Sequence, residues 1–343
     1  MNTDANFSHG SNAVAPAAAP GTREVPTRTV PVPDTVSPQM KVLIGAPLSP
    51  TWNVIPKTAA EWKAQIDAAS AAVMSGLPAL RETLRVKVEP MTIDGVKVHM
   101  VTPQAIAPEN QNRLLVHVHG GCFMSFPGES GTLEAILMAG FGRFRVISVD
   151  YRMPPDHPYP AALDDAMTVW KAAIRMAAPK NIAIFGTSAG GNLTLAMILR
   201  AKQDNLPLPG AIAPGSPMSD LSNTGDSFHT NAMLDNVLVA PGMNCDKRAA
   251  FYANGRDLKD PMLSPVYGDL HDFPPAILTS GTRDLLLSST IRVHRKLRQA
   301  GVEAVLQVFE GQSHAQYMRD ASAPETKEAF DEIALFFDKH LGR

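Results

Sequence analysis

Residues 185–192 have the sequence FGTSAGGN, and this stretch decides how the rest of the chain is interpreted. An apolar run ending at Ile184 precedes it, and residues on a helical period follow it. A strand, a Gly-x-Ser-x-Gly turn and a helix in this order hold a serine hydroxyl at a sharp, strained turn. Gly186 and Gly190 suit such a turn because they carry no Cβ. The context favours Ser188 as a nucleophile over the alternative, an ordinary structural turn.

Composition limits the classes of protein to consider. The chain has 343 residues, of which 45% are hydrophobic and 19% charged, so it can bury a large core. Its net charge is -2 and no basic block occurs, which argues against a nucleic-acid partner. No apolar run approaches the ~20 residues of a membrane span. No signal peptide is visible, so the compartment stays open. The cytoplasm is favoured, and the alternative is a secreted or periplasmic protein whose signal peptide was removed.

Cysteines and histidines offer little sign of a metal or redox centre. Cys122 and Cys245 are too few for a disulfide framework or a metal cluster. Cys122 has no base at a recognisable spacing, so we interpret it as a small loop residue. His117 and His119 alternate like a metal-ligand pair, but no carboxylate or cysteine ligand has a matching spacing. Without a Gly-x-Gly-x-x-Gly or Walker loop, no nucleotide cofactor is expected either.

The order of segments predicts a core domain with a cap. Residues 1–38, rich in Pro, Thr, Ala and Ser, predict a flexible arm. Residues 39–84 are helical in pattern and carry a capping-box start at Thr58–Glu61, so we expect cap helices there. Residues 219–260 interrupt the later pattern for longer than an ordinary connection. They predict a cap or lid insertion, the alternative being a surface excursion with a small core of its own.

The two remaining segments, 85–218 and 261–343, alternate apolar strands with helices, which predicts a mostly parallel sheet covered on both faces. A hairpin of 85–93 and 96–102, joined at Asp94-Gly95, supplies an antiparallel edge. Further strands are expected at 114–118, 145–149, 181–184, 211–213, 276–279 and 305–309. The clearest helices are 161–177, 289–300 and 326–341.

A serine nucleophile needs a base and a group that orients the base. In this kind of fold the acid and then the histidine follow the serine in the chain. Asp284 and His314 each lie just past a predicted strand, at the sheet edge where Ser188 also lies. The weaker candidates for these two roles are His229, His271, His294, Asp257, Asp260 and Glu310.

Acyl transfer also needs donors for a developing oxyanion. The sequence His119-Gly120-Gly121-Cys122 follows the third strand, where the oxyanion loop of this kind of fold is expected. Its small residues let backbone N–H groups turn toward a substrate. The N–H of Ala189, directly after Ser188, is a further donor.

Several segments together resemble the hormone-sensitive lipase family of esterases, which has the α/β-hydrolase fold. The loop at 119–122 is similar to the family's His-Gly-Gly-Gly loop, and 186–191 is the motif form with Thr before the serine. Segments 150–155, 157–162 and 260–265 match as well, so the resemblance covers roughly Arg113 to the C-terminus.

The resemblance implies a serine carboxylesterase without a cofactor, acting on a small-molecule ester. It assigns Ser188 as nucleophile, His314 as base and Asp284 as the orienting acid. The oxyanion donors would be the N–H groups of Gly121, Cys122 and Ala189, with Cys122 replacing a glycine of the family. A thiol there would narrow the acyl site or make it sensitive to oxidation. A lactonase, a lipase and a non-catalytic binding module are the alternatives, and a homodimer is left open.

Overall fold

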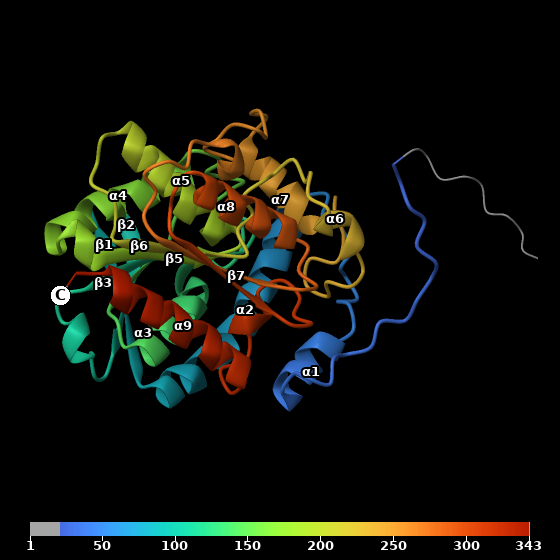
Figure 1. The fold of residues 1–343 in the computed structure, drawn as a ribbon, viewed down its shortest axis with the longest axis horizontal. Coiled ribbons are helices and arrows are strands. Elements are labelled where there is room, and N and C mark those ends of the chain that lie inside the picture. The colour runs from blue at the N-terminus through green and yellow to red at the C-terminus, as the bar shows by residue number, and fades with distance from the viewer. Residues whose placement is uncertain (1–20, 343) are drawn as a thin grey trace, which may run out of the picture. The chain divides into compact units, whose positions relative to one another are not determined.

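A computed structural model of the chain describes residues 21–342 (Figure 1). The first 20 residues of the expected arm lie outside the described residues. Residues 21–31 belong to a separate unit and contain no helix or strand. Everything from Val32 onward belongs to the second unit, which holds the sheet and the site.

The central feature of the second unit is an eight-stranded sheet with the order β1-β2-β4-β3-β5-β6-β7-β8. Strands β3 to β8 pair in parallel, while β2 runs antiparallel to both β1 and β4. The predicted, mostly parallel sheet with an antiparallel edge is therefore confirmed. The strands are β1 (Val86–Ile93), β2 (Val96–Pro103), β3 (Leu114–Val118), β4 (Val146–Val149), β5 (Ile182–Thr187), β6 (Ala211–Gly215), β7 (Ala276–Gly281) and β8 (Ala304–Phe309).

The β1–β2 hairpin turns at the predicted dipeptide. Asp94 has φ 46° and Gly95 has φ 86°, so both central residues have the left-handed backbone of a type I′ turn. Ile93 pairs directly with Val96 across the turn. Asn, Asp and Gly tolerate this backbone best, which is why the sequence signal was reliable here.

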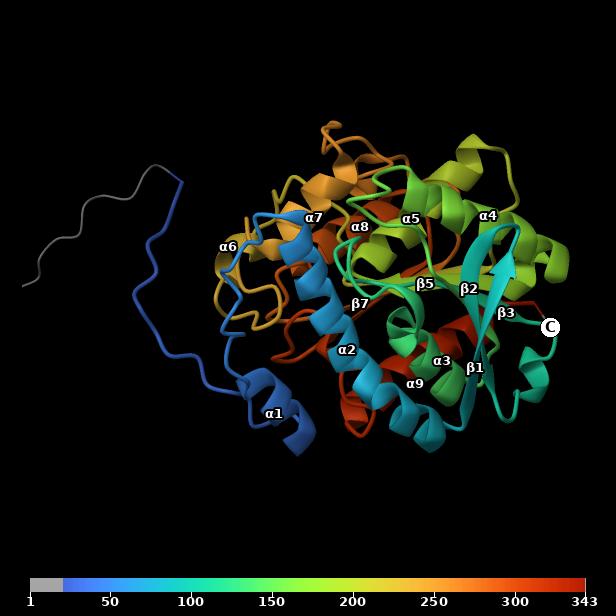
Figure 2. The same ribbon diagram turned by 180° about the vertical axis from the view of Figure 1, so that it is seen from behind.

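Helices cover both faces of the sheet (Figures 1 and 2). One face packs against α4, α5 and α8, and the other against α3 and α9, each over its own cluster of buried apolar side chains. The sequence did not predict α3, the first α-helix after the β1–β2 hairpin. These helices are α3 (Leu133–Gly142), α4 (Ala161–Met176), α5 (Ala189–Gln203), α8 (Leu287–Gln299) and α9 (Pro324–His340).

The predicted helical region 39–84 holds two helices, α1 (Pro38–Gly45) and α2 (Ala59–Leu84). Three prolines lie between them, and proline lacks the N–H that a helix interior requires. At the start of α2, the Thr58 hydroxyl accepts a hydrogen bond from the Glu61 N–H at 3.2 Å. The Glu61 carboxylate in turn accepts one from the Lys57 N–H at 2.6 Å, one residue earlier than in a standard capping box.

The segment 219–260 holds two short helices, α6 (Ser227–Thr230) and α7 (Asn244–Ala253), joined by irregular chain. In Figures 1 and 2, α7 lies near one end of the long helix α2. None of the helices within residues 21–342 is long and apolar enough to cross a membrane.

Candidate active site

Ser188 lies at the turn between β5 and α5, with the unusual backbone angles φ 66° and ψ -119°. The turn brings the chain against the carbonyl oxygen of Val118. A Cβ on Gly186 would lie 2.0 Å from that oxygen, and one on Gly190 would lie 1.9 Å from it. Both positions therefore exclude every residue except glycine, and the strained serine between them is held by the close approach of β3.

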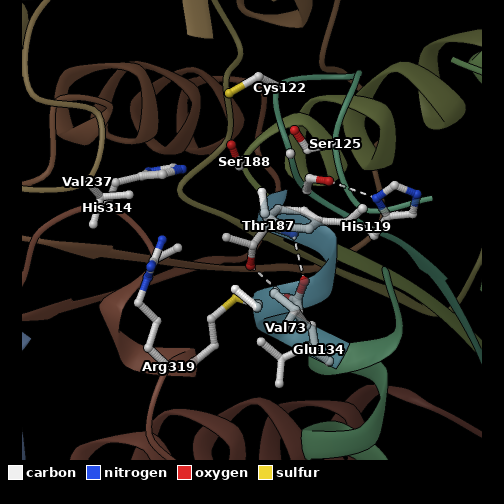
Figure 3. A pocket seen from close by; sticks show the side chains of 18 of the residues that line it. Val73, His119, Cys122, Ser125, Glu134, Thr187, Ser188, Val237, His314 and Arg319 are labelled. Atoms are coloured by element: carbon white, nitrogen blue, oxygen red, sulfur yellow. Dashed lines mark hydrogen bonds between the residues drawn. The ribbon is translucent and has the colours of Figure 1, made fainter. Parts of the chain in front are cut away.

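Glu134, on α3, holds the residue before the serine. Its carboxylate accepts hydrogen bonds from the Thr187 N–H at 3.0 Å and the Thr187 hydroxyl at 2.7 Å (Figure 3). The same hydroxyl is 2.6 Å from that of Tyr317. Sequence reasoning missed Glu134 and Tyr317 because neither lies in a motif and only the fold brings them to Thr187.

His314 and Asp284 are brought together by the loops that follow β8 and β7. Nδ1 of His314 is 3.0 Å from a carboxylate oxygen of Asp284, and both side chains are buried. Asp284 also accepts hydrogen bonds from the Ser216 hydroxyl at 2.5 Å and the Leu286 N–H at 2.8 Å. These contacts orient the imidazole and direct its Nε2 away from Asp284.

The surroundings of Asp284 favour its charged form despite its burial. Desolvation disfavours the carboxylate, but the attraction of His314 and the hydrogen bonds from His314, Ser216 and the Leu286 N–H outweigh it and lower the pKa of Asp284. A second buried acid, Asp235, accepts hydrogen bonds from the N–H groups of Leu285 at 2.9 Å and His314 at 3.4 Å. Burial and the nearby Asp284 raise the pKa of Asp235. Sequence reasoning missed this neighbour as well.

A cavity of about 780 Å³ lies above the strand ends and connects these groups (Figure 3). Ser188, His314, Gly121 and Cys122 line it, while Asp284 lies behind His314 and does not. Within the described residues, the Ser188 hydroxyl makes no hydrogen bond to His314. Active-site hydrogen bonds in ligand-free proteins are often long and tighten when substrate binds.

The loop after β3 has an unusual backbone. Gly121 has φ 112°, and Cys122 and Phe123 have φ 53° and 64°. His119 is buried, and its Nδ1 is 2.7 Å from the Gly120 carbonyl oxygen, so Nδ1 carries the proton and donates. Burial lowers the pKa of His119 to about 3, which keeps the ring neutral. The Tyr151 hydroxyl donates to the His119 carbonyl at 2.7 Å and fixes the start of the loop.

The interpretation of Cys122 as an unpaired small residue is wrong. Cys122 and Cys245 form a disulfide across 123 residues, and the chain has no free cysteine. The bond joins the loop after β3 to α7 of the 219–260 segment. The expected free thiol is therefore absent, and an S–S bridge lines the cavity beside Ser188 instead.

Arg248 makes a second connection between these parts. From α7, its guanidinium donates to the Ser125 hydroxyl and to the Gln65 side-chain carbonyl oxygen of α2, both at 2.6 Å. It lies 5.4 Å from the Trp62 ring centre. Thus α2, α7 and the loop after β3 form one connected wall of the cavity. Three aromatic side chains of the 219–260 segment, Phe228, Phe251 and Tyr252, are not part of the cavity lining.

The remaining candidates from the sequence have other partners. His294 lies on α8 next to the Ala304 carbonyl, and the exposed His271 contacts Asp269. His117 is buried between Ser148 and Glu134, which accounts for it without a metal. None of His229, His271, His294, Asp257, Asp260 or Glu310 lines the cavity. Among residues 21–342, no three side chains of His, Cys, Asp or Glu gather in a metal-binding arrangement.

Comparison with known proteins agrees with this fold. The family described as the alpha/beta hydrolase fold matches residues 115–318. An esterase of Acinetobacter venetianus is 33% identical over 73% of this chain and 82% of its own length. An acetyl-hydrolase of Streptomyces hygroscopicus is 27% identical over 73% of this chain and 83% of its own.

Solved structures show the same relationship. The crystal structure of an esterase with 43% identity superimposes with a TM-score of 0.90 and covers 94% of this chain and 99% of that one. A hormone-sensitive lipase from a metagenome library has 25% identity and a TM-score of 0.75, covering 84% of this chain and 94% of its own.

The fold and its relatives define the class of protein, an α/β hydrolase that acts on carboxylic esters. Within that class, the chain belongs to the hormone-sensitive-lipase-like family of esterases.

Proposed function

We propose that Ser188, His314 and Asp284 form the catalytic triad of a serine carboxylesterase. The observation that carries this proposal is the 3.0 Å contact between Asp284 and His314, which lines the same cavity as the strained Ser188. Asp284 would hold the imidazole in the tautomer that leaves Nε2 free as a base. Its lowered pKa keeps it ionised at neutral pH, as this role requires.

In the reaction, His314 Nε2 takes the proton of the Ser188 hydroxyl while the serine oxygen attacks the ester carbonyl. The tetrahedral intermediate collapses as His314 gives this proton to the leaving alcohol, and an acyl-enzyme remains. A water molecule, deprotonated by His314, then attacks the acyl-enzyme and releases the acid together with the free serine.

We propose the N–H groups of Gly121, Cys122 and Ala189 as oxyanion donors. Those of Gly121 and Cys122 have no acceptor within the described residues. The N–H of Ala189, the first residue of α5, has no partner within the helix, and the positive end of the helix dipole adds to its field. Each donor of this kind contributes about 3 kcal/mol to the stabilisation of the transition state.

We also propose that residues 39–84 and 219–260 act as a cap that selects the ester, and that short- to medium-chain acyl groups are preferred. Support comes from the side chains of α2 and of residues 237–248 in the cavity lining, and from the disulfide beside Ser188. A series of esters from C4 to C12 tests the preference. Faster turnover of C12 than of C4 esters would favour a lipase instead, and a parallel lactone series tests a lactonase.

The direct test of the triad is Ser188→Ala, assayed on a short-chain aryl ester. We expect turnover to fall to background, with the circular dichroism spectrum unchanged. Ser289→Ala removes another buried serine hydroxyl, on α8 outside the cavity, and should keep full turnover. An organophosphate should label Ser188 in the wild-type protein. Retained turnover in Ser188→Ala would contradict the proposal.

A further inference from the structure

Arg319 brings a positive charge to the cavity. It directly follows the short 3-10 helix Gln316–Met318, five residues after His314, and its side chain belongs to the cavity lining. Arg319 is exposed and lines the cavity. Figure 3 shows its guanidinium extending toward the part of the cavity where His314 lies.

The guanidinium of Arg319 makes no hydrogen bond or ion pair within residues 21–342. An arginine carries five N–H donors in a planar fork and stays charged in proteins, so such a group normally finds acceptors. Protein surrounds it deeply enough that desolvation lowers the pKa of Arg319, with Asp235 opposing the shift. The five donors of this guanidinium are therefore free to bind an anion that enters the cavity.

The other charged groups of the cavity each make hydrogen bonds to protein groups, although the Nε of Arg248 has no partner. Glu134 accepts hydrogen bonds from Thr187. The Asp320 carboxylate accepts from the N–H and hydroxyl of Ser322. Arg248 donates to two neutral oxygen atoms, of Ser125 and Gln65. Among the described residues of the lining, Arg319 is therefore the charged side chain that makes no hydrogen bond or ion pair at all.

We propose that Arg319 binds a carboxylate group of the substrate, so that the preferred ester is a monoanion such as a half-ester of a short dicarboxylic acid. The inference rests on the proposed function, because it assumes that the ester reacts at Ser188 in the same cavity. A carboxylate and a guanidinium pair through two parallel hydrogen bonds, and the pairing is strongest where water is scarce. We expect a preference of about 10- to 100-fold for the anionic ester.

Two matched pairs of esters test the proposal. Monoethyl glutarate and ethyl pentanoate differ only in a carboxylate or methyl group at the end of the acyl chain. The pair 4-acetoxybutyrate and butyl acetate differs in the same way on the alcohol side. The measured quantity is the ratio of kcat/KM for the anionic ester to kcat/KM for its neutral partner, determined for the wild-type protein and for Arg319→Met, Arg319→Lys and Arg295→Met.

We expect the wild-type ratio to favour the anion in at least one pair, and to fall at least 10-fold in Arg319→Met. Arg319→Lys keeps the charge without the planar fork and should recover part of the ratio. Arg295, exposed on α8 and outside the cavity lining, is the matched control and should keep the wild-type ratio. A ratio that does not change in Arg319→Met, or no preference in either pair, would overturn the inference.

A binding measurement separates this inference from the proposed function. Calorimetry with glutarate on the Ser188→Ala protein reports anion binding without turnover, and a second Arg319→Met substitution should abolish the heat. If Ser188→Ala still hydrolyses esters but binding depends on Arg319, the triad is wrong and the anion site stands. If Ser188→Ala is inactive and glutarate binding is absent or independent of Arg319, the triad stands and the anion site is wrong.

Discussion

Glu134 accepts two hydrogen bonds from Thr187, one from its N–H and one from its hydroxyl. Thr187 is the residue before Ser188, so a carboxylate on α3 fixes the backbone of the turn that carries the proposed nucleophile. The threonine hydroxyl donates to Glu134, which an aspartate in the same place could do only in its protonated form. The carboxylate of Glu134 and the threonine of the motif are therefore chemically matched.

Thr187→Val should lower kcat/KM about 10- to 100-fold, because it removes the hydroxyl from Glu134 and Tyr317 and leaves buried polar groups without a partner. The effect should appear mainly in kcat, since the turn that carries Ser188 is disturbed. Steady-state kinetics on a short-chain ester measure it. Thr290→Val removes a buried threonine hydroxyl on α8, bound at 3.0 Å to the Leu286 carbonyl, and serves as control. Equal losses in the two variants would contradict a specific role for Thr187.

The disulfide leads to a prediction about both stability and activity. Cys122 and Cys245 close a loop of 123 residues, and the bond joins the proposed oxyanion loop to α7. Reduction should lower the free energy of unfolding by about 2–5 kcal/mol, the range found for native disulfides. It should also lower kcat, because the Cys122 N–H is then held less firmly.

Thermal unfolding and kcat with and without dithiothreitol measure these effects. The double variant Cys122→Ser/Cys245→Ser is the control, since dithiothreitol should change neither its melting temperature nor its activity. A wild-type protein that keeps its kcat after complete reduction would show that the bond stabilises the cap alone.

The sequence predicts some parts of the fold and the candidate site, but not others. The placement of Ser188, Asp284 and His314 near one edge of the sheet could be predicted because each follows a strand, and parallel strands end at one edge of a sheet. The hairpin was readable from Asp94 and Gly95 because the turn depends on local backbone preference.

Features that depend on contacts between distant parts of the chain could not be predicted from the sequence. Nothing in the residues around Glu134, Asp235 or Arg319 indicates what they face, since helix packing and loop paths decide it. The Cys122–Cys245 pairing was missed for the same reason, because two cysteines 123 residues apart carry no pairing signal of their own.

Asp220 provides a prediction about pH. It is fully buried and accepts hydrogen bonds from Ser222, Thr224 and Arg292. Burial opposes its charge, but these bonds prevail and lower the pKa of Asp220 from 3.8 to about 2. Because the folded pKa lies below the unfolded one, Asp220 stabilises the fold fully above about pH 4, and this contribution disappears as the pH falls through 2.

Asp220→Asn should therefore lower the free energy of unfolding at pH 7 by about 1–2 kcal/mol, a figure reduced for solvent screening at the partly exposed Arg292. The difference in unfolding free energy between Asp220→Asn and the wild-type protein should shrink below pH 4. Urea unfolding across pH 2–7 measures it, with the exposed Asp67→Asn as the control. A difference that stays constant over this range would point to lost packing rather than to charge.

Gly190 and Gly76 give opposite predictions for the same substitution. A Cβ on Gly190 would lie 1.9 Å from the Val118 carbonyl oxygen, a backbone atom that cannot move without shifting β3. Gly190→Ala should therefore displace the Ser188 turn and abolish turnover, along with a clear loss of thermal stability.

Gly76 lies inside α2, where a Cβ would meet nothing within 4 Å. Alanine favours a helix over glycine by roughly 0.5–1 kcal/mol, so Gly76→Ala should raise the melting temperature while the fold is kept. Differential scanning calorimetry and an ester assay on the two variants decide the matter, and an active, fully stable Gly190→Ala would show that the turn is not as tightly held as the Val118 contact requires.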